Sequence, residues 1–157
     1  IKKEYGIKPL TDVKLIRIKW GKKMITKFNH VAIAVTDLKS ASDLYQNILG
    51  AQVSDICNYP NHGVSVVFVK LSNTKIELIQ PFGKNSPIEN FIQKNQNGGI
   101  HHICLEVKDI YKTRDKLLKN GVRILGDKEP KVGAHDKPVL FLHPKDFNGT
   151  LIELEQE

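Results

Sequence analysis

The sequence has few of the features that stabilise secreted scaffolds or anchor proteins in membranes. Its 157 residues include only two cysteines, Cys57 and Cys104, too few for a disulfide framework, so reduced thiols are expected. No apolar run approaches the roughly 18 residues of a membrane span. P-loop, G-x-G-x-x-G, H-E-x-x-H and C-x-x-C motifs are absent, which removes the usual signatures of nucleotide and zinc-protease sites. What remains is the composition of one globular domain, 40% hydrophobic and 26% charged.

The positive charge is confined to one end of the chain. Residues 1–27 hold nine basic and two acidic side chains, whereas residues 28–157 hold fifteen of each. A neutral body without a basic helix does not favour nucleic acid, so neither a nucleic-acid nor a membrane partner is expected. We interpret residues 1–26 as a basic N-terminal extension, either a targeting remnant or an incidental segment upstream of Met24. Residues 27–157 then form the domain.

The domain contains an internal repeat. FNHVAIAVTDL (28–38) aligns with IHHICLEVKDI (100–110) at a constant offset of 72, with identical His, Val and Asp positions. Further matches pair residues 66–69 with 139–142 and residues 76–78 with 152–154. A period of this length is too long for a solenoid repeat and indicates two copies of a half-domain.

Each half, about residues 27–82 and 99–157, reads as a strand, a helix and three strands. Period-two alternation predicts the first strand, and a helix runs from the N-cap Asp37 to Gly50 in one half and from Asp109 to Gly121 in the other. Strands follow around 52–57, 64–71 and 74–80, and around 122–126, 138–143 and 150–155. A capping box at residues 86–89 predicts a short connecting helix. The expected fold is α+β: two tandem βαβββ modules forming a curved, barrel-like mixed sheet around a cavity.

Alternation also predicts which side chains point inward. His30, on the face opposite the helix, shares its parity with two alanines that leave room for a ligand. The repeat places His102, Cys104 and Glu106 on the same inner face, and Glu77 and Glu153 each stand between two apolar residues of a strand. One interpretation makes these ordinary core histidines and solvent-facing glutamates. The other, which we favour, is that His30, Glu77, His102 and Glu153 bind a divalent metal.

These residues lie in stretches that closely resemble the vicinal oxygen chelate superfamily, and within it the methylmalonyl-CoA epimerase family. The resemblance covers about residues 27–155. It rests on NHVAIAV (29–35), ILGA (48–51), GVSVVFV (63–69), NTKIEL (73–78), GGIHHIC (98–104), GAH (133–135), FLHPK (141–145) and LIEL (151–154).

The resemblance implies an isomerase that interconverts (R)- and (S)-methylmalonyl-CoA in propionyl-CoA catabolism, by proton transfer at C2 through a metal-stabilised enolate. It implies a divalent cation, most often Co²⁺ or Mn²⁺ with Zn²⁺, Ni²⁺ or Mg²⁺ as alternatives, held at positions matching His30, Glu77, His102 and Glu153. An acyl-CoA substrate and a homodimer follow from the same resemblance. So does a location in the mitochondrial matrix in a eukaryote, or in the cytoplasm otherwise.

Proton transfer on both faces of C2 calls for two acid–base groups. We assign these roles to Glu153 and Glu77. In some bacterial members the position matching Glu77 is glutamine, and a glutamate acting as a base lies on the neighbouring strand. Here that second position is Val66. Glu77 therefore combines metal contact with proton transfer, or another group is the second base.

Three other functions remain open on the same residues. A glyoxalase-type lyase would use the same metal ligands on a hemithioacetal, and an extradiol-type iron(II) oxygenase would use His30, His102 and Glu153 as a facial triad. A non-enzymatic metabolite-binding module of the same fold would lack the metal. Several residues are expected to have minor roles: Cys104 in packing, His135 and His143 in loops at the pocket entrance, Lys131 and Lys145 in solvent or near CoA phosphates, and His62 in a turn without function.

Overall fold

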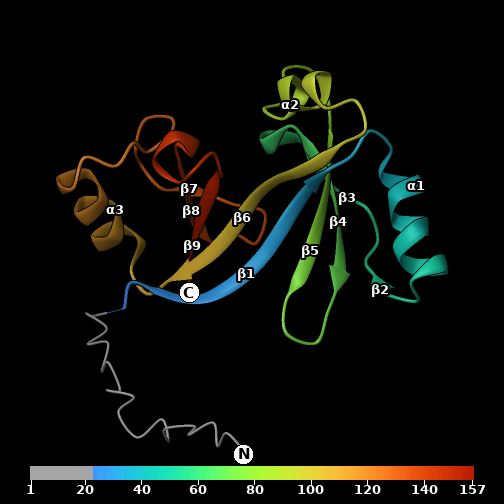
Figure 1. The fold of residues 1–157 in the computed structure, drawn as a ribbon, viewed down its shortest axis with the longest axis horizontal. Coiled ribbons are helices and arrows are strands. Elements are labelled where there is room, and N and C mark those ends of the chain that lie inside the picture. The colour runs from blue at the N-terminus through green and yellow to red at the C-terminus, as the bar shows by residue number, and fades with distance from the viewer. Residues whose placement is uncertain (1–22) are drawn as a thin grey trace, which may run out of the picture.

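The structure is a computed structural model that describes residues 23–157, and within them it forms one nine-stranded mixed sheet. The strands follow the order β2-β4-β5-β1-β6-β9-β8-β7, and β3 pairs with β4 outside this path. Most of the predicted basic N-terminal extension, residues 1–22, lies outside the described residues. The long strands β1 (Ile25–Ala34) and β6 (Gly99–Val107) run side by side through the middle of the molecule (Figure 1). The sheet is curved and open, so the predicted mixed sheet is confirmed but no closed barrel forms.

The two predicted halves are related by a pseudo-twofold arrangement about the central pair of strands. β1 and β6 are antiparallel, β5 (Lys75–Pro81) is parallel to β1, and β9 (Ile152–Gln156) is parallel to β6. Outside them lie β4 (Val64–Lys70) and β8 (Pro138–Leu142), both antiparallel to their neighbours. The short strands β2 (Gln52–Val53), β3 (Cys57–Tyr59) and β7 (Lys131–Val132) complete the order. The internal repeat in the sequence is therefore a repeat in the fold.

The helix of the first half begins where Asp37 predicts, because its carboxylate accepts a hydrogen bond from the Ser40 amide. It runs as α1 (Leu38–Asp43) and then widens into a π-helical segment, η1 (Leu44–Ile48), instead of continuing to Gly50. A π turn contains an additional residue, and the apolar side chains of this segment point in different directions. Tyr45 packs against the core, whereas Ile48 is 75% exposed.

The connecting helix also differs from its predicted start. α2 (Glu89–Lys94) begins after Ile88, which has no side-chain capping bond. Ser86 is buried and its Oγ has no hydrogen-bond partner, so the predicted capping box does not form. The chain instead begins the helix with a backbone turn, in which the Glu89 amide donates to the Ser86 carbonyl.

The second half follows its prediction except in one segment. α3 (Ile110–Lys119) begins at Asp109, whose carboxylate accepts from the Lys112 amide. Residues 122–126 were predicted as a strand but make only one isolated bridge, between Ile124 and Leu142. A carboxylate supplies the missing partner, because the Arg123 amide donates to Asp146 instead of to a neighbouring strand. The strand prediction for this segment is wrong.

The outer face of the sheet packs against the helices as two separate cores. In the first half Ile33 and Val35 pack with Leu38 of α1, and in the second half Leu105 packs with Ile110 of α3. The inner side chains Ala32 and Ala34 are fully buried, but Ile88 and Phe91 at the start of α2 cover them, so the space they leave is filled by protein. None of the helices in residues 23–157 is long and apolar enough to cross a membrane.

Candidate metal centre

Four side chains converge where the two halves meet, two from each half. His30 comes from β1 and His102 from β6, while Glu77 and Glu153 come from β5 and β9. The register explains the convergence: Ala32 of β1 pairs with both His102 and Glu77, and Cys104 of β6 pairs with both His30 and Glu153. All four side chains are at least nine-tenths buried, as the sequence predicts for an inner face.

The four side chains touch through one atom each. The Nε2 of His30 lies 3.3 Å from Oε2 of Glu77, 3.3 Å from Oε2 of Glu153 and 3.4 Å from Nε2 of His102. The Nε2 of His102 lies 3.2 Å from Oε2 of Glu153 and 3.7 Å from Oε2 of Glu77. All four contacts of the two glutamates with the imidazoles use Oε2, and Oε1 of each has no imidazole neighbour.

This spacing fits a small divalent cation. Metal–nitrogen and metal–oxygen bonds of about 2.1 Å in a tetrahedral site place neighbouring donor atoms about 3.4 Å apart. The five contacts above, between 3.2 and 3.7 Å, scatter around that value. Neutral imidazole and carboxylate are also the donor types that first-row divalent metals share. The residues predicted from the sequence thus form a chemically suitable set.

Charge in this cluster is balanced by the histidines. Burial opposes a charged imidazole at His30, but hydrogen bonds with Glu153 and Glu77 outweigh it and raise the pKa of His30 to about 9. Burial likewise opposes the carboxylate of Glu153, and hydrogen bonds from His102 and His30 instead lower its pKa. A proton on His30 therefore offsets part of the negative charge of the buried carboxylates. A divalent cation would displace this proton and take over the same role.

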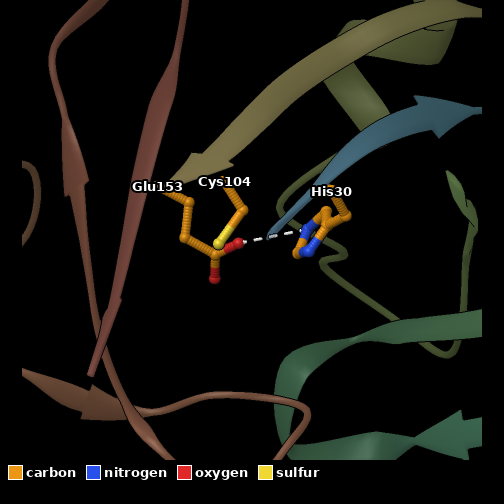
Figure 2. Close-up of side chains that lie close together, drawn as sticks. All are labelled: His30, Cys104 and Glu153. Atoms are coloured by element: carbon orange, nitrogen blue, oxygen red, sulfur yellow. Dashed lines mark ion pairs between the residues drawn. The ribbon is translucent and has the colours of Figure 1, made fainter. Parts of the chain in front are cut away.

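Cys104 lies at the edge of the same cluster. Figure 2 shows its sulfur beside the Glu153 carboxylate, with His30 facing both from β1. The ligand atoms of these three residues lie within 4.8 Å of one another. Burial and the negative charge of Glu153 raise the pKa of the Cys104 thiol, which keeps it protonated. Because a metal binds the thiolate, the expected packing role of Cys104 agrees with this environment.

The cluster forms part of the wall of a cavity of about 470 Å³. Glu77, Glu153 and His102 line it, and His30 lies behind them. Apolar side chains make up much of the remaining wall, contributed by both halves: Val64, Val66, Ile79, Val139, Leu140, Phe141 and Leu151. The cavity is thus suited to a ligand with an apolar part beside an oxygen-rich part that can approach the cluster.

Two residues next to the histidines were missed by the sequence reasoning. His30 Nδ1 lies 2.8 Å from Oδ1 of Asn29, and His102 Nδ1 lies 2.9 Å from Nδ1 of His101. Burial lowers the pKa of His101 to about 4, so its ring is neutral. Strict alternation assigns Asn29 and His101 to the outer face, and only the identical offset of 72 between the two pairs could have indicated them.

A third missed residue is Glu155, which is 3% exposed and faces inward two residues after Glu153. One carboxylate oxygen accepts from Nδ2 of Asn29 at 3.0 Å, and the other lies 2.9 Å from Nδ1 of His135. His135 in turn accepts a hydrogen bond of 2.8 Å from Lys75 through Nε2. His135 therefore supports a buried carboxylate, and it does not join the ligand cluster. The parity shared with Glu153 could have identified Glu155.

The remaining sequence candidates lie away from the cluster. His143 accepts from the Lys145 amide and so caps a short 3-10 turn, which gives it a structural role. Lys131 lines the cavity and pairs with Asp127. His62, for which no function was expected, also lines the cavity, beside Tyr59.

Known proteins are similar to this chain in both sequence and fold. Residues 29–141 match the Glyoxalase/Bleomycin resistance protein/Dioxygenase superfamily. An ethylmalonyl-CoA/methylmalonyl-CoA epimerase of Cereibacter sphaeroides is 61% identical over 133 residues, which cover 85% of this chain and 99% of the relative. A mitochondrial methylmalonyl-CoA epimerase of Dictyostelium discoideum is 59% identical over 87% of this chain and 82% of its own length.

A solved structure extends the comparison to a bound ligand. A variant of Streptomyces coelicolor methylmalonyl-CoA epimerase, in complex with 2-nitronate-propionyl-CoA, superposes with a TM-score of 0.77 at 29% identity, over 85% of this chain and 95% of that one. Sequence and fold thus agree on one assignment. The chain belongs to the Glyoxalase/Bleomycin resistance protein/Dioxygenase superfamily and, within it, to the methylmalonyl-CoA epimerase family.

Proposed function

We propose that this protein epimerises methylmalonyl-CoA at C2 with a divalent cation held by His30, Glu77, His102 and Glu153. The observation that carries the proposal is the convergence of two imidazoles and two carboxylates on the wall of one cavity, in a chain 61% identical to an epimerase of this substrate class. The nitronate in the complex of the Streptomyces relative supports it, since a nitronate carbon is planar like the C2 of an enolate.

The substrate explains why such a cluster is useful. C2 lies between a thioester carbonyl and a carboxylate, and removing its proton delocalises negative charge onto the thioester oxygen. A divalent cation, when bound, would stabilise that charge as a Lewis acid. The apolar wall of the cavity excludes water from the carbon that is to be protonated, and this strengthens every electrostatic interaction at the site.

We assign the two proton transfers to Glu153 and Glu77. They come from opposite halves of the pseudo-twofold sheet, and both line the cavity. In each, Oε2 contacts the imidazoles, so Oε1 is available to take or return a proton. One glutamate would remove the proton from one face of C2 and the other would deliver a proton to the opposite face, with roles exchanged for the opposite epimer.

Val66 supports the assignment of Glu77 to the second face. Val66 is 1% exposed and pairs with Ile79, while the next residue of that face, Phe68, pairs with Glu77. Val66 and Glu77 both line the cavity. The position that carries a base in some bacterial relatives is therefore apolar here, and Glu77 is the ionisable group beside it.

A single-face exchange experiment tests these roles. Each epimer is incubated separately in D₂O with Co²⁺-loaded enzyme, and deuterium at C2 and inversion are followed by mass spectrometry and chiral analysis. With Glu77→Gln we expect inversion of both epimers to fall by about 10²-fold or more, while one epimer still exchanges its C2 proton. With Glu153→Gln we expect the opposite epimer to exchange.

Glu89→Gln is the matched control, because Glu89 is an exposed carboxylate on α2 that neither lines the cavity nor contacts the cluster. Its rates should stay within about twofold, as expected for a surface substitution. Normal inversion by Glu77→Gln would remove Glu77 from the proton transfer. Absence of any exchange by the unsubstituted, metal-loaded enzyme would refute the epimerase function itself.

We further propose Co²⁺ or Mn²⁺ as the native metal, with Zn²⁺, Ni²⁺ or Mg²⁺ as alternatives. The donor set supports this range, since imidazole and carboxylate suit all the first-row ions and carboxylate suits Mg²⁺. Elemental analysis of protein purified from its source without added metal would decide among them. A preparation with full activity after exhaustive chelation would overturn the metal requirement.

We propose a homodimer and, for a eukaryotic source, a location in the mitochondrial matrix, with the cytoplasm as the location otherwise. The relative from Dictyostelium is named mitochondrial, which supports the location. Light scattering after size exclusion tests the dimer, and cell fractionation tests the location. A monomer at micromolar concentration, or enzyme outside these compartments, would contradict the respective proposal.

A further inference from the structure

The residue before each ligand histidine contacts the far nitrogen of that histidine. Asn29 Oδ1 lies 2.8 Å from Nδ1 of His30, and His101 Nδ1 lies 2.9 Å from Nδ1 of His102. The pairs occupy equivalent places in the two halves, since both members are separated by 72 positions. Adjacent residues of a regular strand point to opposite faces, so these contacts need a local departure from the strand.

A β-bulge provides that departure in both strands. Phe28 pairs with Leu105 and His30 with Cys104, so Asn29 is the extra residue on β1. Ala32 pairs with His102 and Ile33 with Ile100, so His101 is the extra residue on β6. A bulge re-aims the side chain of the extra residue, here toward the histidine that follows. Both bulges therefore direct the side chain of the extra residue to Nδ1 of the histidine that follows it.

In the first half the hydrogen-bond partners of Asn29 determine which nitrogen of His30 carries a hydrogen. Asn29 Nδ2 lies 2.9 Å from Oε1 of Glu106 and 3.0 Å from Oε1 of Glu155, and carboxylate oxygens only accept. Both amide hydrogens are thereby committed, and Oδ1 is left as an acceptor against His30 Nδ1. His30 must donate from Nδ1, which leaves the Nε2 lone pair for a metal.

In the second half the partner is another imidazole, which can donate or accept. A metal on Nε2 of His102 requires the hydrogen of that ring to be on Nδ1. The hydrogen bond of 2.9 Å then requires His101 to accept through Nδ1, so the His101 ring carries its hydrogen on Nε2. Within residues 23–157 that Nε2 has no protein partner, and Ser86 Oγ is the sole enclosed polar side-chain atom without one. Solvent or a ligand can therefore reach it.

We propose that Asn29 and His101 are positioning residues that set the tautomers of the two metal-binding histidines. His101 also presents its Nε2–H as a hydrogen-bond donor to the acyl-CoA in the cavity that it lines. The two halves therefore differ: the Asn29 side ends in the partly buried carboxylate of Glu106 and the buried carboxylate of Glu155, whereas the His101 side opens to the cavity. This inference rests on the proposed metal centre.

The tautomers can be observed directly in the intact protein. In Zn²⁺-loaded enzyme, long-range ¹H–¹⁵N correlation of the histidine rings should show His30 and His102 protonated at Nδ1 and His101 protonated at Nε2. His101 protonated at Nδ1 would overturn the proposal, whatever the substitutions do to folding.

Substitutions separate the two roles of His101. His101→Ala and Asn29→Ala should each weaken Zn²⁺ binding by about 10- to 100-fold in calorimetry, the usual effect of removing such a partner. His101→Asn keeps an acceptor near the Nδ1 position, so we expect its metal affinity to return to within about threefold, whereas its KM for methylmalonyl-CoA stays raised by about tenfold.

Ile100→Val is the control on the same strand, because Ile100 is 65% exposed and takes no part in the cluster. Ile100→Val should leave both the Zn²⁺ affinity and the KM for methylmalonyl-CoA unchanged. Tight Zn²⁺ binding that neither alanine substitution weakens would overturn this inference alone. Failure of the unsubstituted protein to bind Zn²⁺ or Co²⁺ would overturn the metal centre, and this inference with it.

Discussion

Val66 and Glu77 lie on neighbouring strands and face the same cavity, so a carboxylate could in principle serve the substrate from either position. This predicts that the second base can be moved. Glu77→Gln should lose inversion, and adding Val66→Glu to it should restore at least about tenfold of the lost rate, because a general base near C2 is regained. Coupled-enzyme assays of both epimers measure the recovery.

The single substitution Val66→Glu is the necessary comparison. It buries a carboxylate without a designed partner, which costs stability of the order of several kcal/mol. We therefore expect a lowered urea midpoint with little gain in rate. A double variant no faster than Glu77→Gln, although folded by circular dichroism, would show that the geometry at position 66 cannot reach C2.

Individual residues also show how far the sequence could predict the site. The inward position of His30, Glu77, His102 and Glu153 could be predicted because alternation and the repeat agree at those four positions, while their roles as ligands stay a prediction. Asn29 and His101 were missed, since a bulge reverses the parity on which the argument depends, and no local pattern marks these bulges. Register with the partner strand creates them, and register is a property of the folded sheet.

At the scale of elements, the entry of the chain into β6 depends on one glycine. Gly98 has a φ of +74°, and a Cβ there would lie 2.4 Å from the Ala34 carbonyl oxygen at the end of β1. Gly50 has a φ of +66°, and a Cβ there would have no neighbour within 4 Å. Gly50→Ala should therefore cost about 1–2 kcal/mol from backbone strain alone, and Gly98→Ala about 1–3 kcal/mol more from the clash.

Urea unfolding of the two variants measures this difference under identical conditions. Because both positions have positive φ, the strain common to them cancels in the comparison. Equal urea midpoints for Gly50→Ala and Gly98→Ala would mean that β1 and β6 can separate at this point without loss of stability. The Co²⁺ affinity of Gly98→Ala should also fall, since the pairing it disturbs positions both histidines.

In segment 122–126 a side chain takes the place of a strand partner, because the carboxylate of Asp146 accepts the hydrogen bond from the Arg123 amide. Hydrogen bonds from the Arg123 side chain and amide lower the pKa of Asp146 to about 2. A carboxylate with a lowered folded pKa stabilises the fold above its ordinary pKa of 3.8 and loses this contribution as the pH falls toward 2. Protection of the Arg123 amide from hydrogen exchange should therefore decrease across that window.

Asp146→Ala provides the comparison at constant pH, because alanine leaves no side-chain acceptor for the Arg123 amide. It should expose the Arg123 amide to exchange at neutral pH and remove most of the acid dependence at this position. Unchanged protection in the variant would assign the order of this segment to the Ile124–Leu142 bridge instead. The strand prediction for residues 122–126 was wrong for a related reason: the apolar pattern identifies which residues are inside but not which group accepts the backbone hydrogen bond.

At the scale of the whole molecule, the duplication explains why the predicted architecture was confirmed while its details were not. The repeat relates β1 to β6 and β5 to β9, and this alone places two side chains of the cluster from each half around the pseudo-twofold axis. Details that differ between the halves, such as the π-helical end of α1 and the single bridge made by residues 122–126, depend on packing within one half. A symmetric pattern cannot predict these asymmetric features.

The proposed metal centre should therefore act as a link between the halves. A cation that binds the folded protein at about a thousand times its Kd stabilises it by about 4 kcal/mol, which corresponds to a rise of about 10 °C in Tm for a domain of this size. Differential scanning calorimetry with Co²⁺ and after chelation measures the rise. His30→Ala and His102→Ala, one from each half, should each abolish it.

Comparing His30→Ala with His102→Ala tests whether both halves are needed to hold the cation. If one half alone held the cation, substitution in the other half would leave most of the stabilisation in place. Equal loss from both sides means that the ion is bound only when β1 and β6 are paired, because only then do the four donor atoms lie within 3.7 Å of their neighbours. Metal binding and association of the two halves would then be one equilibrium.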